Sequence, residues 1–229
     1  MSQVRGGLPE LVHTIGIDPD GGEFTLEDLR ARGRGHSRDQ LAARQADIGP
    51  NDPYTIVYTS GTTGPPKGVV LTQANGMSVC QIVRELEFVR PDETVYLYLP
   101  LAHVFALITQ LASLDQGTAL VHYGGNTKQI LQELIETKPT YLPSVPRIFE
   151  KLYAAAMMMQ EKASEEDRRS FQQAIKLGVV VRRRRQHGDP VTEELERAFE
   201  AADARIFARV RELFGGRLRQ AVSGAAPIA

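Results

Sequence analysis

The sequence predicts an α/β fold in which a parallel-rich sheet is layered with helices. From residue 52 onward, short β-branched and aromatic runs alternate with longer segments whose apolar residues recur at three- and four-residue steps. That alternation is typical of strands joined by helical crossovers, which pair in parallel. Residues 1–51 show no comparable pattern. The chain is therefore expected to divide into a weakly patterned N-terminal segment, residues 1–51, and an α/β region, residues 52–229.

The α/β region opens with two strands and a helix. Residues 55–59 (TIVYT) are β-branched and aromatic, and residues 68–71 (GVVL) resume an apolar pattern after a break rich in Gly and Pro, so each run predicts a strand. Residues 73–86 carry apolar or small side chains at helical spacing, which predicts a helix packed on the sheet. Residues 94–99 alternate Tyr with aliphatic residues and predict another strand.

The later elements continue the alternation. The expected order is helix 104–114, strand 118–122, helix 128–137, strand 140–142, a helix from 146 to 159, and a last strand at 218–223. Before that strand, Asp189-Pro190 predicts the capped start of a charged helix, and Gly215-Gly216 predicts its end through a left-handed turn. The basic block Arg182 to Arg185 is followed closely by acidic residues and is expected to form a solvated connecting turn.

Composition limits the class of function. The chain has 229 residues, of which 42% are hydrophobic, and its net charge is −1, so nucleic-acid binding is not expected as its main activity. Its single cysteine, Cys80, excludes an internal disulfide and a cysteine metal cluster. The single cysteine makes a reducing cytoplasm the expected location. Residues 1–50 contain no sustained apolar run that would mark a signal peptide.

The stretch between Glu93 and Asp115 could be interpreted as a membrane span. No formal charge lies between Glu93 and Asp115, and a run of ~20 apolar residues would span a bilayer. Pro100 and several polar residues interrupt the stretch, and its first part has the pattern of a strand. A buried strand, turn and helix are therefore expected, with at most peripheral contact to a membrane.

A loop rich in hydroxyls and glycines lies between the first two predicted strands. The segment from Tyr58 to Asn75 reads YTSGTTGPPKGVVLTQAN. Its glycines allow backbone N–H groups to approach an anion, its hydroxyls add donors, and its lysine adds a positive charge. The candidate phosphate-binding residues are Thr59, Ser60, Gly61, Thr62, Thr63, Gly64 and Lys67.

Spacing excludes two common phosphate loops. A Walker loop requires a second Gly where this chain has Pro66, and a Ser or Thr where Gly68 follows Lys67. The dinucleotide fingerprint fails because Thr63 occupies the place of its second Gly, counted from Gly61. The segment is therefore either a phosphate loop of another kind or a Gly/Ser/Thr turn that binds nothing.

This loop resembles the signature loop of the adenylate-forming superfamily, the ATP-dependent acyl-CoA synthetases and their relatives. Three later segments are similar to motifs of the same enzymes: LPLAHVF at 99–105, VPRIFEKLY at 145–153, and AVSGAAPIA at 221–229. The second of these is found in the long-chain members in particular. The resemblance covers residues 52–229 and is best matched by long-chain fatty acid–CoA ligases.

The resemblance implies a reaction and its participants. A fatty acid would react with ATP in the presence of Mg²⁺ to give an acyl-adenylate and pyrophosphate, and CoA would then take the acyl group. Thr59 would lie on the metal side of the phosphates. The implied wall of the acyl and adenine pockets is His103, Phe105, Gly224, Ala225, Ala226 and Pro227.

One position departs from the family pattern, and one set of charged residues is left without a catalytic role. Ala225 stands where the family usually has a second Gly, so its Cβ would crowd the ligand or oppose a conformation with φ > 0. Arg147, Glu150 and Lys151 are interpreted as a surface or ion-pair set without a catalytic role.

The resemblance also covers well under half of such a ligase. The family's later motifs, including its catalytic lysine, are expected beyond Ala229, so no catalytic residue is assigned. The predicted function is that of an internal fragment of a long-chain ligase, inactive or nearly so by itself, which needs the rest of its domain or self-associates through an exposed apolar face.

Three alternatives remain open at this point. The chain could be a non-enzymatic nucleotide- or phosphate-binding remnant, or part of a fatty acyl-AMP ligase that transfers nothing to CoA. It could also be an interaction protein that works through its basic block, residues 182–185.

Overall fold

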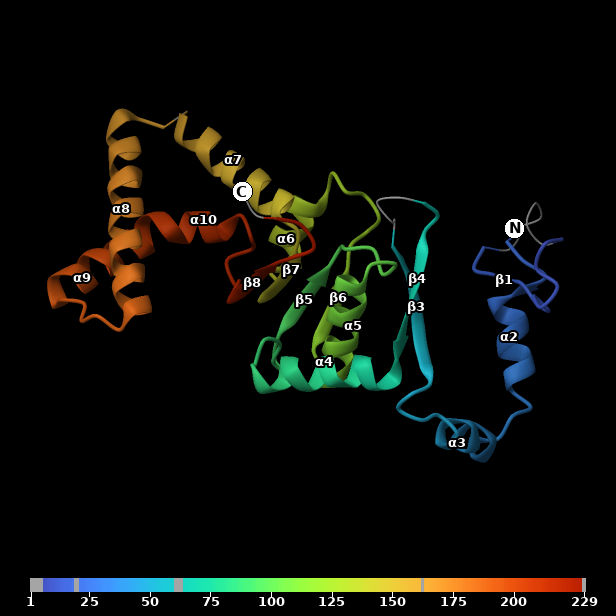
Figure 1. Ribbon diagram of the computed structural model, residues 1–229. Helices are drawn as coiled ribbons and strands as arrows, with labels where there is room; N and C mark the ends of the chain where they lie inside the picture. The colour runs from blue at the N-terminus through green and yellow to red at the C-terminus, as the bar shows by residue number, and fades with distance from the viewer. Residues whose placement is uncertain (1–5, 19–20, 60–63, 162, 228–229) are drawn as a thin grey trace. The chain divides into compact units, whose positions relative to one another are not determined.

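A computed structural model describes residues 6–18, 21–59, 64–161 and 163–227 of the chain (Figure 1). Its Cα atoms form two compact units, Met1–Asp52 and Pro53–Ala229. Each unit is described by itself below.

The first unit contains short elements and very little buried surface. Its elements are the strands β1 (Ile15–Gly16) and β2 (Phe24–Thr25), which pair in parallel, and the helices α2 (Leu26–Gly33) and α3 (Arg38–Ala46). Thr25 and Ser37 begin the two helices with capping boxes, which satisfy the first backbone N–H groups. No residue of either helix is buried, so the order of this unit comes from local hydrogen bonds rather than from a core.

The second unit opens with an antiparallel hairpin. Strands β3 (Pro53–Thr59) and β4 (Lys67–Thr72) pair so that Thr59 lies opposite Lys67. Helix α4 (Gln73–Glu85) follows directly, capped by Thr72, whose Oγ1 accepts a hydrogen bond from the Asn75 N–H at 3.3 Å. The two strands that the sequence predicted on either side of the hydroxyl-rich loop are therefore present, and they hold its two ends together.

The centre of the second unit is a four-stranded parallel sheet in the order β6-β5-β7-β8 (Figure 1). Its strands are β5 (Thr94–Leu97), β6 (Ala119–His122), β7 (Tyr141–Ser144) and β8 (Gln220–Ser223). The helices connecting them are α5 (Val104–Gln116), α6 (Ile130–Thr137), α7 (Pro146–Glu161), α8 (Glu165–His187), α9 (Glu193–Ala202), the π-helix η1 (Asp203–Phe207) and α10 (Ala208–Glu212). The predicted α/β fold with a parallel-rich sheet is confirmed.

Successive residues of a strand pack into two different hydrophobic cores, one on each face of the sheet. Tyr96 and Leu142 pack with residues of α6 and α7, including Leu134 and Ile148. Their neighbours Val95 and Tyr141 pack on the other side of the sheet. Because side chains of a strand alternate between the two faces, a sheet covered on both faces needs apolar residues at successive positions. This is why these strands read as continuous apolar runs.

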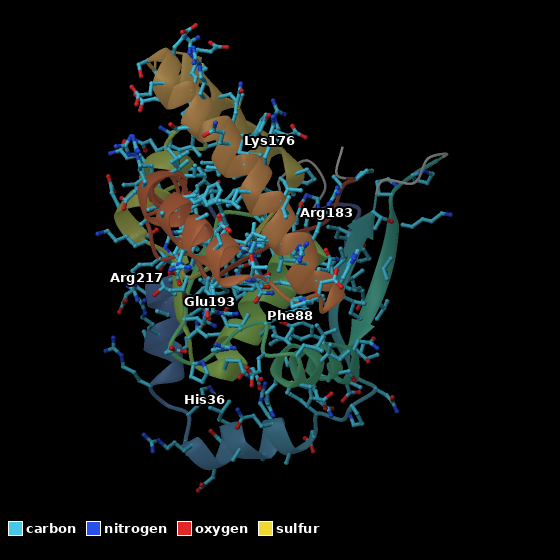
Figure 2. All side chains as sticks on the ribbon, turned by 90° about the vertical axis from the view of Figure 1, so that its left-hand side faces the viewer. His36, Phe88, Lys176, Arg183, Glu193 and Arg217 are labelled. Carbon is cyan, nitrogen blue, oxygen red and sulfur yellow. The ribbon has the colours of Figure 1, made fainter. Side chains whose placement is uncertain are left out.

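A buried carboxylate joins three of the strands at their amino ends. Glu93, which precedes β5, is 4% exposed and pairs with the guanidinium of Arg219, which precedes β8. Its Oε2 also accepts a hydrogen bond from the hydroxyl of Thr140, which precedes β7, at 2.8 Å. Arg219 donates a further bond to the carbonyl of Phe88 at 3.0 Å; Phe88 is labelled in Figure 2. A buried charge is tolerated because these partners satisfy it.

Two sequence predictions about the C-terminal helices were wrong. Arg182 to Arg185 do not form a connecting turn; they lie in the last turns of α8, where positive side chains favourably meet the negative end of the helix dipole. The following helix begins after Thr192, whose Oγ1 accepts the Leu195 N–H at 3.3 Å, rather than at Asp189-Pro190. The left-handed turn at the end is confirmed, since Gly215 and Gly216 have φ values of +83° and +80°.

The Glu93–Arg219 pair gives a first testable prediction. Arg219→Met should lower the free energy of unfolding by about 3 kcal/mol, because it leaves the Glu93 carboxylate buried without its cation. The double variant Glu93→Gln with Arg219→Met should recover most of that loss. Urea unfolding of the two single variants and the double variant measures the coupling; additive losses would contradict a direct interaction between the two groups.

Tyr141 gives a prediction about alkaline pH. Burial is the main cause that raises the pKa of the Tyr141 phenol to about 12; Glu93 adds to this effect and Arg219 opposes it. The neutral phenol is favoured in the folded state, so its contribution to stability is complete below pH 10 and is lost as the pH rises towards 12. Burial raises the pKa of Tyr96 as well, which adds to the loss.

Tyr141→Phe should therefore be less sensitive to alkali than the parent chain. Between about pH 9 and about pH 11, the parent should lose about 1 kcal/mol more of its free energy of unfolding than Tyr141→Phe does. Urea unfolding at both pH values measures the difference. Equal losses in the two proteins would show that the phenol titrates alike in the folded and unfolded states.

Candidate active site

A cavity of about 890 Å³ lies at the carboxyl end of the parallel sheet. Residues that follow each of the four strands line it: Tyr98 after β5, Tyr123 after β6, Val145 after β7 and Ala225 after β8. Further lining residues come from the end of β3 and from the first turns of α5 and α7. Open α/β sheets bind their ligands at this edge, which makes the cavity the candidate active site.

His103 and Phe105 reach the cavity from the start of α5. His103 is the N-cap of this helix, with extended backbone angles, and its N–H donates to the carbonyl of Pro100 at 3.0 Å. Its imidazole makes no capping hydrogen bond to the helix and is exposed. Phe105 lies in the first turn beside Gly224, where an added Cβ would come 3.4 Å from the aromatic ring. The fold therefore places the predicted Gly224 and Phe105 next to each other.

The turn after β8 has unusual backbone geometry. Ala225 has φ +65°, in the left-handed region, which costs an L residue roughly 1 kcal/mol or more. Ala225 lines the cavity, at the position where the sequence predicted that a Cβ would crowd the ligand or oppose a positive φ; the positive φ is nevertheless adopted. Ala226 and Pro227 are exposed and are not among the described lining residues, so the structure does not bring them to this cavity.

The phosphate-loop residues are only partly described. Ser60, Gly61, Thr62 and Thr63 lie outside the described residues. Thr59 lines the cavity, and its hydroxyl donates to the Lys67 carbonyl at 3.5 Å. Gly64 has φ +115° and open space around it, and Lys67 is exposed at the start of β4. Lys67 makes no ion pair with any carboxylate in the described ranges, so its ammonium group is available to a ligand.

The described side chains at the cavity offer few oxygen ligands for a metal ion. Within the described residues, no group of three or more His, Cys, Asp or Glu side chains could hold a metal. Thr59 offers one hydroxyl oxygen, exposed at the cavity. Mg²⁺ prefers oxygen ligands and keeps several waters, with substrate phosphates completing its shell, so a single protein hydroxyl is compatible with it.

Several cavity residues were not predicted from the sequence. The hydroxyls of Tyr98 and Ser144 share a hydrogen bond of 2.6 Å, which fixes the Tyr98 ring at the cavity wall. Ser223, opposite Ser144 in the sheet register, has a buried hydroxyl without a partner in the described part of the chain. Arg147 and Lys151 also line the cavity. Their four-residue spacing was visible in the sequence, but not the side of α7 that faces the site.

Comparison with known proteins identifies the family. The model of the family described as "AMP-binding enzyme" matches residues 4–228. The chain belongs to this family. The match extends through the first unit as well as the second.

Several curated relatives are named as long-chain acyl-CoA ligases or synthetases. The chain is 34% identical over its full length to the long-chain-fatty-acid–CoA ligase FadD15 of Mycobacterium tuberculosis, of which it covers 38%. It is 33% identical to the peroxisomal long chain acyl-CoA synthetase 6 of Arabidopsis thaliana, with 78% of this chain and 24% of the relative aligned. Long chain acyl-CoA synthetase 3 of the same plant is 33% identical, over 90% of this chain and 30% of its own length. The chain thus spans about a quarter to two fifths of the length of these relatives.

The length and apolar character of the helices decide whether one of them could cross a membrane. None in the described ranges combines the length and the apolar character required to cross a bilayer. The uncharged stretch between Glu93 and Asp115 forms β5, a turn and α5, as the sequence predicted.

Ala225 allows a direct test of backbone strain at the site. Ala225→Gly should raise the free energy of unfolding by up to about 1 kcal/mol, because relief of the left-handed conformation exceeds the entropy that Gly adds to the unfolded chain. The neighbouring Ala226→Gly is the matched control. It should lower stability by about 0.5–1 kcal/mol, since Ala226 is not among the described residues with positive φ. Equal effects of the two substitutions would show that Ala225 is unstrained.

Proposed function

We propose that this AMP-binding chain forms part of a long-chain fatty acid–CoA ligase and supplies walls of its nucleotide and acyl site. In the proposed reaction, a carboxylate oxygen of the fatty acid bonds to the α-phosphorus of ATP while the bond from that phosphorus to pyrophosphate breaks. The thiolate of CoA then bonds to the acyl carbon, and AMP leaves with the oxygen that joined it to the acyl group.

One observation carries this proposal. Three segments that are far apart in the sequence meet at one cavity at the carboxyl edge of the sheet. They are the end of β3, the start of α5 and the turn after β8. Thr59, His103 and Ala225 mark these segments, and each lies in a segment that resembles a motif of acyl-CoA synthetases. The names of the curated relatives support a long-chain carboxylate as the acid.

The chain's residues have distinct proposed roles. Lys67 and the loop residues 60–64 hold the β- and γ-phosphates, where fixed donors and a cation steady the negative charge of the departing pyrophosphate. Bound Mg²⁺ would neutralise phosphate charge, and Thr59 would contribute one oxygen to its shell. His103 and Phe105 border the acyl chain, and Gly224 and Ala225 border the adenine and the acyl group. Removal of water by the apolar wall strengthens the polar contacts.

The surroundings of the site suggest further partners. The β3–β4 hairpin exposes large apolar side chains on both strands: Tyr54, Ile56, Tyr58, Val69 and Val70. Exposed apolar surface of this kind favours association, and we propose that further parts of the same domain or a second copy of the chain cover it. We also propose a cytoplasmic location with at most peripheral membrane contact, fatty acid, ATP and CoA as substrates, and no nucleic-acid partner.

Nucleotide binding tests the phosphate loop. ATP with Mg²⁺ should raise the Tm of the 229-residue chain, and Lys67→Ala should weaken ATP binding about tenfold, the equivalent of one charge-assisted hydrogen bond. The control is Lys176→Ala, which removes an exposed lysine of α8 (Figure 2). Calorimetric titration measures both affinities. Equal weakening in the two variants would contradict a phosphate-binding role for Lys67.

A second measurement separates a ligase from a phosphate-binding module. A non-hydrolysable analogue of palmitoyl-adenylate should bind more tightly than the same analogue with an acetyl group, because the longer chain buries more apolar surface. Exchange of labelled pyrophosphate into ATP that depends on fatty acid would add direct support. ATP binding with no preference between the two analogues would instead favour the non-enzymatic nucleotide-binding alternative.

A further inference from the structure

Two basic side chains of α7 line the cavity together. Arg147 occupies the first turn of the helix and Lys151 lies four residues later, so both side chains project from the same face of α7. Residues at this spacing have Cβ atoms about 6 Å apart. Ile148, between them in the sequence, is buried in the core beneath and fixes which face of the helix is turned to the cavity.

The charge of the cavity wall is unbalanced. Among the described residues that line the cavity, none is Asp or Glu, whereas Arg147 and Lys151 are both cations. Neither cation makes an ion pair with a carboxylate in the part of the chain that the structure describes. The nearby acidic residue of α7, Glu150, is exposed and is not one of the described lining residues. Arg147 and Lys151 are exposed as well, so their charged groups lie at the solvent side of the cavity.

The remaining wall makes these charges more effective. Much of it is apolar, with Val104, Phe105 and Ile148 facing the same space. Charges beside apolar walls interact more strongly with a ligand than charges surrounded by water, and walls of one sign raise the local concentration of an oppositely charged ligand. The amino end of α7, which starts at Pro146, adds the positive end of its helix dipole at the same place.

The spacing of the two cations selects the kind of anion. A guanidinium binds phosphate oxygens in a two-pronged manner, and an ammonium adds a point charge. A single carboxylate can occupy one of these positions, whereas a diphosphate or triphosphate extends over both. A group with several phosphates therefore matches this wall better than the carboxylate of a fatty acid.

We propose that Arg147 and Lys151 bind a phosphate-bearing group of a substrate at the mouth of the cavity. The group is the polyphosphate of ATP or the phosphates of CoA, which share this chemistry. The inference rests on the proposed function, because that function supplies the two substrates, and it gives the pair a binding role that the sequence alone did not assign.

The test uses a double variant that carries both Arg147→Ala and Lys151→Ala. It is compared with a control that loses the same amount of charge. The control is the double variant Lys176→Ala with Arg183→Ala, which removes one lysine and one arginine from α8, where Figure 2 shows both side chains. Calorimetric titration measures the affinity of each 229-residue protein for ATP with Mg²⁺, for CoA and for palmitate. Circular dichroism and Tm confirm that each protein is folded.

The Arg147/Lys151 double variant should bind ATP or CoA at least tenfold more weakly than the parent, with a smaller dependence on salt, while the α8 control stays within about twofold. Weakening for ATP alone assigns the pair to the nucleotide, and weakening for CoA alone assigns it to the thiol substrate. Arg147→Lys with Lys151 intact should retain more affinity than Arg147→Ala. Unchanged affinity for both ligands, or weaker binding of palmitate only, would overturn the inference.

These results also separate the inference from the proposed function. If ATP and the palmitoyl-adenylate analogue bind and Lys67→Ala weakens them, but the α7 double variant does not, only the inference fails. If the double variant weakens CoA or ATP but the long-chain analogue shows no advantage over the acetyl analogue, the inference holds and the proposed function fails. If the parent binds no phosphate-bearing ligand, both fail.

Discussion

The buried Glu93 carboxylate is the interaction on which the arrangement of the site depends. It connects Arg219 and Thr140, and these three residues stand immediately before β8, β7 and β5. Since the strands are parallel and of similar length, fixing their amino ends in one register also aligns their carboxyl ends. The cavity lies at that aligned edge. A charged group at one end of the sheet therefore helps to shape the ligand site at the other.

The site combines rigid and strained positions. The hydrogen bond between Tyr98 and Ser144 fixes one wall of the cavity, and Gly224 leaves room for the Phe105 ring beside it at another. Ala225, by contrast, keeps a left-handed backbone conformation that an L residue adopts only at some cost. Strain of this kind persists when the surrounding structure holds it in place, and it is concentrated at ligand sites. The turn after β8 is both strained, at Ala225, and located at the proposed ligand site.

The charge pattern complements the proposed chemistry. Fatty acid, ATP and CoA are all anions, and the described cavity wall carries cations without carboxylates. The whole chain has a net charge of only −1, so this local excess of positive charge is not a reflection of composition. It arises because the fold places basic residues of α7 beside the site, while acidic residues such as Glu93 and Glu133 are engaged elsewhere in buried or partly buried hydrogen bonds.

The sequence by itself determined the fold class, most elements and the family, because these depend on local patterns. The apolar runs predicted strands, the three- and four-residue spacing predicted helices, and the loop motif with Lys67 indicated the family that the comparison then identified. The predicted helix boundaries were wrong where local signals competed. Thr192 rather than Asp189 caps α9, and the basic block lies within α8 because its charges suit a helix end.

Only the tertiary structure decided which residues share the cavity. Arg147 and Lys151 have the spacing of any exposed helical pair, and Tyr98 belongs to an ordinary apolar strand pattern. Their places at the site depend on which face of α7 packs on the sheet and on how β5, β7 and β8 are ordered. Those contacts join residues far apart in the chain, and no local pattern records them.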